Sequence, residues 1–209
     1  MPAPPLPFLP PDLHGKLVIF AMLAFAGEAA AAEQAIAPFR ALGPLVDMVK
    51  AGPYTQMFPP EDPNFHPTAS APTMFIEKVD KSVGGVIVDT LKTASSSFAA
   101  VQLRVLEGAV ARVPADATAY AHRSSPIMVN VMALYTPEDR ARQQAWTAAF
   151  AEALRQDEVG AYVNFLGGEG VERVRAAYPG ETWKRLQTVK AKYDPDNLFR
   201  LNQNIAPAK

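Results

Sequence analysis

Tyr162 and Asn164 are a pair of side chains whose types and spacing suit ligand binding. They lie in AYVNFL (161–166), whose apolar and aromatic residues predict a short strand. Because alternate residues of a strand point to the same side, the phenol and the amide would face one ligand together. The same spacing fits a core tyrosine whose hydroxyl is bonded by Asn164, and the sequence leaves both interpretations open.

A second group of polar side chains lies close to the end of the chain. The segment YDPDNLFRLNQNI (193–205) joins a turn-forming Asp-Pro-Asp-Asn run to a row of amides, which are Asn202, Gln203 and Asn204. Leu198 and Phe199 are apolar side chains of the kind that anchor a segment in a core. Chain ends are commonly frayed, so this composition indicates a segment that holds a ligand or a neighbouring domain.

The motifs of several common enzyme classes are missing from the sequence. It contains no G-x-S-x-G elbow, no H-E-x-x-H, no G-x-x-x-x-G-K-[ST] and no G-x-G-x-x-G after a strand. GGEG (167–170) is typical of a turn or a helix start. The histidines, His14, His66 and His122, are far apart and have no metal-ligand spacing, so no metal site is expected.

Composition limits the classes of partner. The 209 residues carry a net charge of −1, which gives no electrostatic reason to expect nucleic acid or an anionic membrane as a partner. The chain has no cysteine, which excludes disulfides and thiolate chemistry and favours a cytoplasmic setting. The apolar run 17–25 is too short to span a bilayer, and the proline-rich stretch before it lacks the basic residues of a signal peptide. A buried strand is the favoured interpretation of this run.

Hydrophobic periodicity and turn residues predict mixed strands and helices. Their order is not the strict alternation of a parallel fold, so the sequence predicts an α+β protein, an antiparallel sheet with helices packed on one face. The expected strands are 16–25, 73–79, 97–106, 127–135 and 161–166, with 108–113 as a further strand beside 97–106. The expected helices are one within 27–44, one at 81–92, one starting at Thr136-Pro137, and two short ones after residue 166.

Strand alternation also predicts a polar sheet face. In the strands 97–106 and 127–135, Gln102, Arg104 and Asn130 fall on the side opposite the β-branched residues. If the β-branched side packs against the helices, these three residues face outward and can cover a ligand. A solvated sheet face is the alternative, and these residues alone do not separate the two.

Residues 161–205, AYVNFLGGEGVERVRAAYPGETWKRLQTVKAKYDPDNLFRLNQNI, resemble the C-terminal end of the berberine-bridge-enzyme-like flavin oxidoreductases. These enzymes are part of a wider group of flavoproteins with vanillyl-alcohol oxidase and p-cresol methylhydroxylase. VQLRVLEGAVARVPADATAYAHR (101–123) resembles the sheet region of the same family, and a looser resemblance extends back to about Gly15. The resemblance implies a ferredoxin-like substrate domain that consists of residues 15–160 and 161–209 and follows a proline-rich arm at residues 1–14.

The resemblance also implies roles for individual residues. Tyr162 would be the catalytic or substrate-orienting phenol, and Asn164, Asn202, Gln203 and Asn204 would lie at FAD. Gln102, Arg104 and Asn130 would face the substrate. In the family an FAD-binding domain precedes this region, and no such domain lies in this sequence. FAD is therefore expected as the cofactor without being held by this chain alone, and a separate or upstream FAD-binding domain is the expected partner.

Three functions follow as expectations. The first is the substrate-binding part of an FAD-dependent oxidoreductase, inactive alone, that acts on a small molecule by passing a hydride to flavin N5, with reoxidation by dioxygen. The second is a stand-alone module without flavin that binds a small molecule or forms a homodimer through the exposed sheet face. The third is a non-functional truncation, which would expose a large apolar patch.

Overall fold

The computed structural model describes residues 1–58, 63–64, 66–157, 160–168 and 170–208. The chain divides into two compact units, Met1–His66 and Pro67–Lys209. The predicted division into 1–14, 15–160 and 161–209 stays a prediction. No helix of the described residues is long and apolar enough to cross a membrane.

The described residues of the first unit form one α-helix and two 3-10 turns: η1 (Pro11–Leu13), α1 (Ala29–Arg40) and η2 (Tyr54–Met57). The predicted helix is confirmed, with Pro38 in its last turn. Arg40 at its end pairs with Glu33 and Asp47, which fixes the chain that follows.

The strand predicted at 16–25 is wrong. Leu17 makes an isolated bridge with Pro2, and residues 18–25 form no strand. Ile19 is 98% exposed. Apolar, β-prone residues form a strand only when a neighbouring strand takes up their backbone groups, and the residues of this unit that the structure describes supply no such neighbour beyond the bridge.

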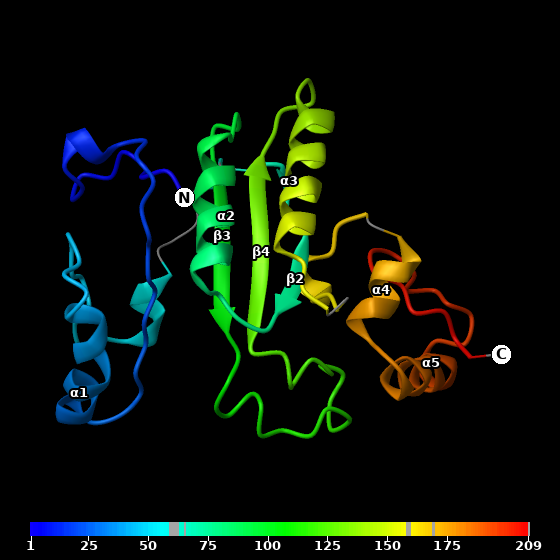
Figure 1. Ribbon diagram of the computed structural model, residues 1–209. Helices are drawn as coiled ribbons and strands as arrows, with labels where there is room; N and C mark the ends of the chain where they lie inside the picture. Colours follow the sequence, from blue (N-terminus) through cyan, green and yellow to red (C-terminus); the bar gives the residue numbers. More distant parts are fainter. Residues whose placement is uncertain (59–62, 65, 158–159, 169, 209) are drawn as a thin grey trace. The chain divides into compact units, whose positions relative to one another are not determined.

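The second unit is built on an antiparallel sheet (Figure 1). Its strands are β1 (Ala69–Ser70), β2 (Thr73–Ile76), β3 (Ala99–Val105) and β4 (Ile127–Leu134). β4 is central: β3 pairs along one side of it, and β1 and β2 pair one after the other along the opposite side. The strands expected at 73–79, 97–106 and 127–135 are confirmed.

Two helices cover one face of this sheet, α2 (Lys81–Lys92) and α3 (Arg140–Leu154), as Figure 1 shows. The Ser70 hydroxyl, on the side of Ala133, hydrogen-bonds Thr147 of α3 at 2.7 Å. The β-branched side of β4 therefore faces the helices, and Val129 and Val131 are fully buried there. The α+β fold with an antiparallel sheet and helices on one face is confirmed.

The predictions for the segments that follow β3 and β4 are wrong. Residues 108–113 form turns, with Arg112 N–H donating to the Gly108 carbonyl, because Gly108 has a φ of +66° and breaks an extended conformation. Helix α3 begins after Asp139, later than the Thr136-Pro137 start. The Asp139 carboxylate accepts the Thr136 N–H at 2.7 Å and holds those residues in a turn.

The C-terminal part of this unit is helical. It contains η3 (Val163–Phe165), α4 (Val171–Ala177) and α5 (Glu181–Tyr193). Both predicted short helices after residue 166 are confirmed. They enclose a small core of their own, formed by Ala161, Leu166, Val174 and Ala177.

Candidate functional site

The face of the sheet away from α2 and α3 carries the predicted polar residues. The register sets Gln102 and Thr73 on either side of Asn130, and Arg104 and Phe75 on either side of Met128. Directly opposed residues in a sheet share a face. Gln102, Arg104 and Asn130 are therefore together on one face, as strand alternation predicted.

The side chains of these three residues differ in their exposure to solvent. Asn130 is 3% exposed, and its amide nitrogen donates to the Ala71 carbonyl at 3.1 Å. Gln102 and Arg104 are exposed, and the Arg104 guanidinium donates to the Gln102 side-chain oxygen at 3.1 Å. A ligand on this face meets the Gln102–Arg104 pair first.

A group of five rings lies beside this face, and we call it the ring cluster: Phe75, Tyr120, His122, Tyr162 and Phe165. Phe75 and His122 stack with centroids 4.5 Å apart, and Tyr120 meets the edges of His122 and Tyr162 at 6.1 and 5.8 Å. Tyr162 lies 5.7 Å from Phe165, whose ring carries the Arg104 guanidinium at 4.6 Å. The cluster thus links the sheet to the segment that contains Tyr162.

Tyr162 lies on a turn, and the strand predicted at 161–166 is wrong. The N–H groups of Phe165 and Leu166 donate to the carbonyls three residues earlier, at 3.0 and 3.1 Å, which makes η3 a 3-10 turn. The turn brings the Asn164 amide nitrogen to 2.8 Å from the Tyr162 hydroxyl. This hydrogen bond is the one expected if Tyr162 is a core tyrosine whose hydroxyl is bonded by Asn164. However, Tyr162 is only half-buried and Asn164 is exposed.

Bonds over long sequence distances hold this segment on the sheet. Arg173 of α4 donates to the Thr73 carbonyl at 2.8 Å, and His122 Nε2 lies 3.1 Å from the Ala176 carbonyl oxygen. A Cβ on Gly160 would stand within 2.7 Å of the His122 ring. Only glycine lets the chain pass this close to that ring.

The C-terminal amides return to the same segment. The Gln203 side chain donates to the Leu166 carbonyl, directly after η3. Asn202 has a φ of +58°, and its carbonyl accepts the Asn204 N–H at 3.0 Å. The Asn204 side-chain oxygen is buried and has no hydrogen-bond partner among the described residues. The structure therefore brings the 161–166 segment and the row of amides together.

A carboxylate, and not an apolar anchor, fixes the turn before these amides. Leu198 and Phe199 are 70% and 78% exposed, so their predicted role as core anchors is wrong. The Asp194 carboxylate accepts the Leu198 and Phe199 N–H groups at 2.7 and 3.0 Å and pairs with Lys190. The hydrogen bond from Lys190, followed by these backbone bonds, lowers the pKa of Asp194.

This lowered pKa predicts that the turn opens in acid. A carboxyl group with a lowered folded-state pKa stabilises the fold above its unfolded pKa of about 3.9 and loses that effect as pH falls through the folded value. We expect Leu198 and Phe199 amide hydrogen exchange, extrapolated to equal intrinsic rates, to accelerate below about pH 4. Asp194→Asn should accelerate it at neutral pH, whereas the control Asp196→Asn should not. Equal protection in Asp194→Asn would contradict the assignment.

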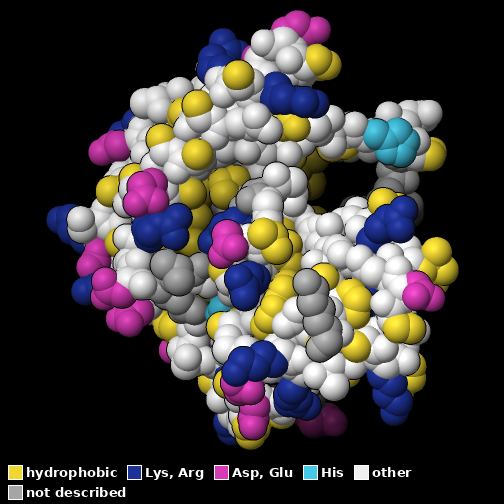
Figure 2. All heavy atoms as spheres, turned by 90° about the vertical axis from the view of Figure 1, so that its right-hand side faces the viewer, with side chains coloured by type: hydrophobic (Ala, Val, Ile, Leu, Met, Phe, Trp, Pro, Cys, Tyr) yellow, Lys and Arg dark blue, Asp and Glu magenta, His cyan; other side chains and the backbone are white. Residues whose placement is uncertain are grey.

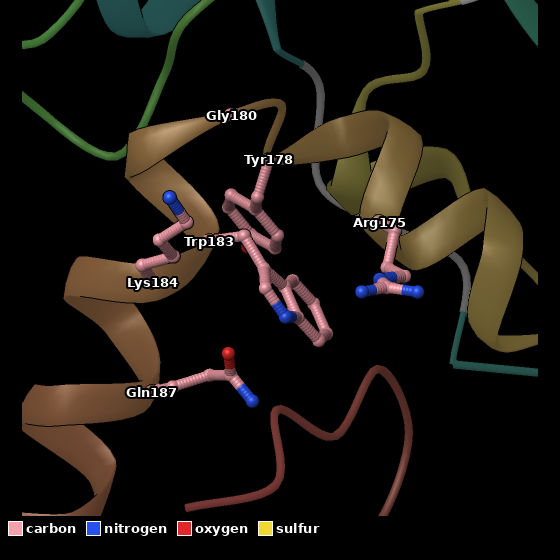
Figure 3. A pocket seen from close by; sticks show the side chains of 6 residues that line it. All are labelled: Arg175, Tyr178, Gly180, Trp183, Lys184 and Gln187. Atoms are coloured by element: carbon pink, nitrogen blue, oxygen red, sulfur yellow. The ribbon is translucent and has the colours of Figure 1, made fainter. Parts of the chain in front are cut away.

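A hollow lies between α4 and α5 (Figure 3). The rings of Tyr178 and Trp183 lie at its centre, with Arg175 reaching in from α4 and Gln187 from α5. Burial, with a smaller effect from the nearby Tyr162, raises the pKa of Tyr178, so this phenol stays protonated at neutral pH. The hollow is open, and Figure 2, seen from the side of α4 and α5, shows hydrophobic side chains interspersed with charged ones of both signs.

Sequence reasoning missed the residues that bind this segment to the sheet, which are Thr73, Phe75, Tyr120, His122, Gly160 and Arg173. Alternation in TMFI (73–76) could have placed Thr73 and Phe75 on one face. The remaining contacts join distant parts of the chain and leave no local pattern. Among the described residues, no group of His, Asp and Glu side chains is arranged to hold a metal ion.

Comparisons with known proteins find relatives of the C-terminal segment and of the α+β fold. Residues 161–206 match the family "Berberine and berberine like". The chain is 33% identical to "Uncharacterized FAD-linked oxidoreductase YgaK" of Bacillus subtilis over 65% of this chain and 30% of that protein. It is 27% identical to "Chitooligosaccharide oxidase" of Gibberella zeae over 76% of this chain and 34% of the relative.

Solved structures share the fold. A structure of chitooligosaccharide oxidase aligns with a TM-score of 0.61 at 21% identity, over 88% of this chain and 45% of that one. A variant of berberine bridge enzyme aligns with a TM-score of 0.57 at 17% identity, over 69% of this chain and 34% of that one. Together the matches support the berberine-bridge-enzyme-like family of FAD-linked oxidoreductases, which includes oxidases. The chain spans 30% and 23% of the length of the first two curated relatives.

Proposed function

We propose that this chain is the substrate-binding part of an FAD-dependent oxidoreductase of the vanillyl-alcohol oxidase type, and that it is inactive without an FAD-binding domain. The observation that carries the proposal is the return of the C-terminal amides to the Tyr162 segment: the Gln203 side chain bonds the Leu166 carbonyl, directly after the turn in which the Asn164 amide bonds the Tyr162 hydroxyl. A cytoplasmic setting, inferred from the lack of cysteine, stays part of the proposal.

The residues at this place fit a flavin ring. The ring edge of a flavin offers carbonyl oxygens and an N–H group, and side-chain amides both donate and accept hydrogen bonds. Asn164, Asn202, Gln203 and Asn204 would hold it, and the buried Asn204 oxygen is an acceptor in need of a donor. When bound, FAD supplies the redox chemistry: it accepts a hydride at N5 and is reoxidised by dioxygen.

The chain's own residues would position the substrate and move its proton. Tyr162 would relay the proton of the substrate hydroxyl: its oxygen would accept this proton while the phenol passes its own proton to solvent, which the half-buried side chain can reach, and the Asn164 amide hydrogen would hold that oxygen in place. The accessible Gln102–Arg104 pair would bind polar groups of the substrate, and the buried Asn130 would support the face beneath them. Hydrogen-bonding groups beside aromatic rings suit the hydroxyl groups of a saccharide, the substrate class that the name chitooligosaccharide oxidase suggests for a relative.

An exposed apolar surface on α5 and the following turn suits the proposed partner domain. Val189, Tyr193, Leu198, Phe199 and Leu201 are each more than half exposed there. Exposed apolar patches on this scale commonly mark interfaces. Since the amides follow directly after this surface, a domain docked on it would bring FAD to them.

Titration with FAD tests the proposal. The purified chain alone should leave flavin fluorescence unchanged. When a separately expressed FAD-binding domain of a relative is added, the mixture should quench flavin fluorescence more than that domain does by itself. Flavin retained by the chain alone would make it an autonomous flavoprotein. Failure of the mixture to form a complex would favour the stand-alone module or the truncation.

A further inference from the structure

A long loop connects β3 to β4. The structure describes its residues 106–126 throughout, and they form no helix or strand (Figure 1). Loops of this length without secondary structure are uncommon, and the ordered ones usually carry a function. The Leu106 N–H donates to the Pro126 carbonyl at 2.8 Å and closes the base of this loop. Tyr120 and His122 of the ring cluster lie on it, so the fold of the loop decides where these two rings lie.

Arg123 lies at the centre of the hydrogen bonds inside this loop. Its guanidinium donates to the Tyr120 and Val110 carbonyls at 3.1 and 3.4 Å, and to the Thr118 hydroxyl oxygen at 2.8 Å. All three acceptors are neutral oxygens of the same loop. A guanidinium directs its N–H groups as a planar, rigid fork, whereas a lysine ammonium acts as a point charge. The shape of the Arg123 side chain therefore fixes three points of the loop.

Ring contacts lead from Arg123 to Tyr162. The Arg123 guanidinium lies over the ring of Tyr120, 4.8 Å from its centroid. The Tyr120 ring in turn meets the Tyr162 ring edge-on, with centroids 5.8 Å apart and an angle of 85° between the planes. The other ring contact of Tyr162, with Phe165, lies within its own turn. Tyr120 is therefore the ring that holds Tyr162 from a distant part of the chain.

The same loop also binds both C-terminal helices. His122 Nε2 lies 3.1 Å from the Ala176 carbonyl oxygen of α4, and Arg185 of α5 donates to the Asp116 carbonyl of the loop. All of these contacts, like those of Arg123, are formed inside the unit Pro67–Lys209, and none of them requires an exposed surface. The loop therefore holds the rings that it carries in a fixed place relative to the C-terminal segment.

We propose that Arg123 is a positioning residue, which sets the Tyr162 phenol for proton transfer by holding Tyr120 against it. The inference rests on the proposed function, in which the Tyr162 oxygen accepts the proton of the substrate hydroxyl. Such a transfer needs the two heavy atoms within about 2.6–3.2 Å of each other, and a misplacement of about 1 Å can cost about 10²-fold in rate. Arg123 acts through the two rings and does not contact the substrate.

A double-mutant cycle tests the role in the chain reconstituted with an FAD-binding domain. Arg123→Lys should lower the limiting rate of flavin reduction by about 10- to 10²-fold and leave substrate binding nearly unchanged. Arg112→Lys, at an exposed position of the same loop, is the control and should keep the rate. In a Tyr162→Phe background Arg123→Lys should change the rate by less than about twofold, because no phenol is left to position. An equal fall in both backgrounds would overturn the proposal, since it would show a general structural effect.

Fluorine NMR of the chain labelled with fluorotyrosine tests the positioning without flavin, with resonances assigned by Tyr→Phe variants. Arg123→Lys should shift the Tyr120 and Tyr162 resonances and leave that of Tyr54 unchanged. Thr118→Val removes one acceptor of the guanidinium at an exposed position and should shift the same two resonances, so the test holds even where Arg123→Lys does not fold.

An unchanged Tyr162 resonance in a folded variant would overturn the proposal. Shifted Tyr120 and Tyr162 resonances would support Arg123 as the residue that positions Tyr162. If the unmodified complex then fails to reduce flavin, that failure counts against the proposed function and not against the positioning.

Discussion

Replacing Tyr162 with phenylalanine is expected to slow flavin reduction by about 10²- to 10⁴-fold in the chain reconstituted with an FAD-binding domain, the range typical for a general acid or base. The change removes the hydroxyl that the Asn164 amide holds at 2.8 Å. It leaves the packing of the ring against Tyr120 and Phe165 in place. The expected loss is therefore chemical and not structural.

Rapid-mixing absorbance of the flavin under anaerobic conditions measures this rate, and the dependence on substrate concentration gives binding separately. Binding should change little, because the loss belongs to the proton-transfer step. Tyr54→Phe is the matched control, since Tyr54 lies in the first unit and is 66% exposed. Equal rates of flavin reduction for the two variants would show that Tyr162 does not take part in the chemical step. If the complex with the FAD-binding domain still forms normally, the proposal of a partner domain would stand.

Replacing Phe75 with alanine is expected to lower the free energy of unfolding by about 3–5 kcal/mol, the usual range for a large buried aromatic residue. Phe75 is fully buried, stacks on His122 and lies beside Gly160. Its removal leaves a cavity and frees the ring that bonds the Ala176 carbonyl. The effect should therefore reach α4 as well as the sheet.

Urea unfolding followed by circular dichroism measures the change. Leu201→Ala is the control, with an expected change within about 0.5 kcal/mol because this side chain is 85% exposed. Hydrogen exchange in α4 should accelerate in Phe75→Ala before the whole unit unfolds. A small change in stability would mean that this face of the sheet is less tightly packed than its burial indicates.

The sequence by itself determined the features that rest on local preference. Helix α2 occupies Lys81–Lys92 as predicted, because Asp80 caps it by accepting the Ser82 and Val83 N–H groups. Alternation alone placed Gln102, Arg104 and Asn130 on one face, because the side-chain period of a strand is two. The antiparallel α+β class followed from the order of such elements.

Only the tertiary structure decided how the candidate site is put together. AYVNFL has the composition of a strand but lies on a turn, and the adjoining α4 is held on the sheet by the Arg173–Thr73 bond, which joins residues 100 positions apart. The run 17–25 has strand-forming residues but no described partner strand, so local preference could not decide its conformation. Strand pairing, ring stacking and capping by Asp194 depend on groups distant in sequence or on side-chain geometry, and a sequence pattern records neither.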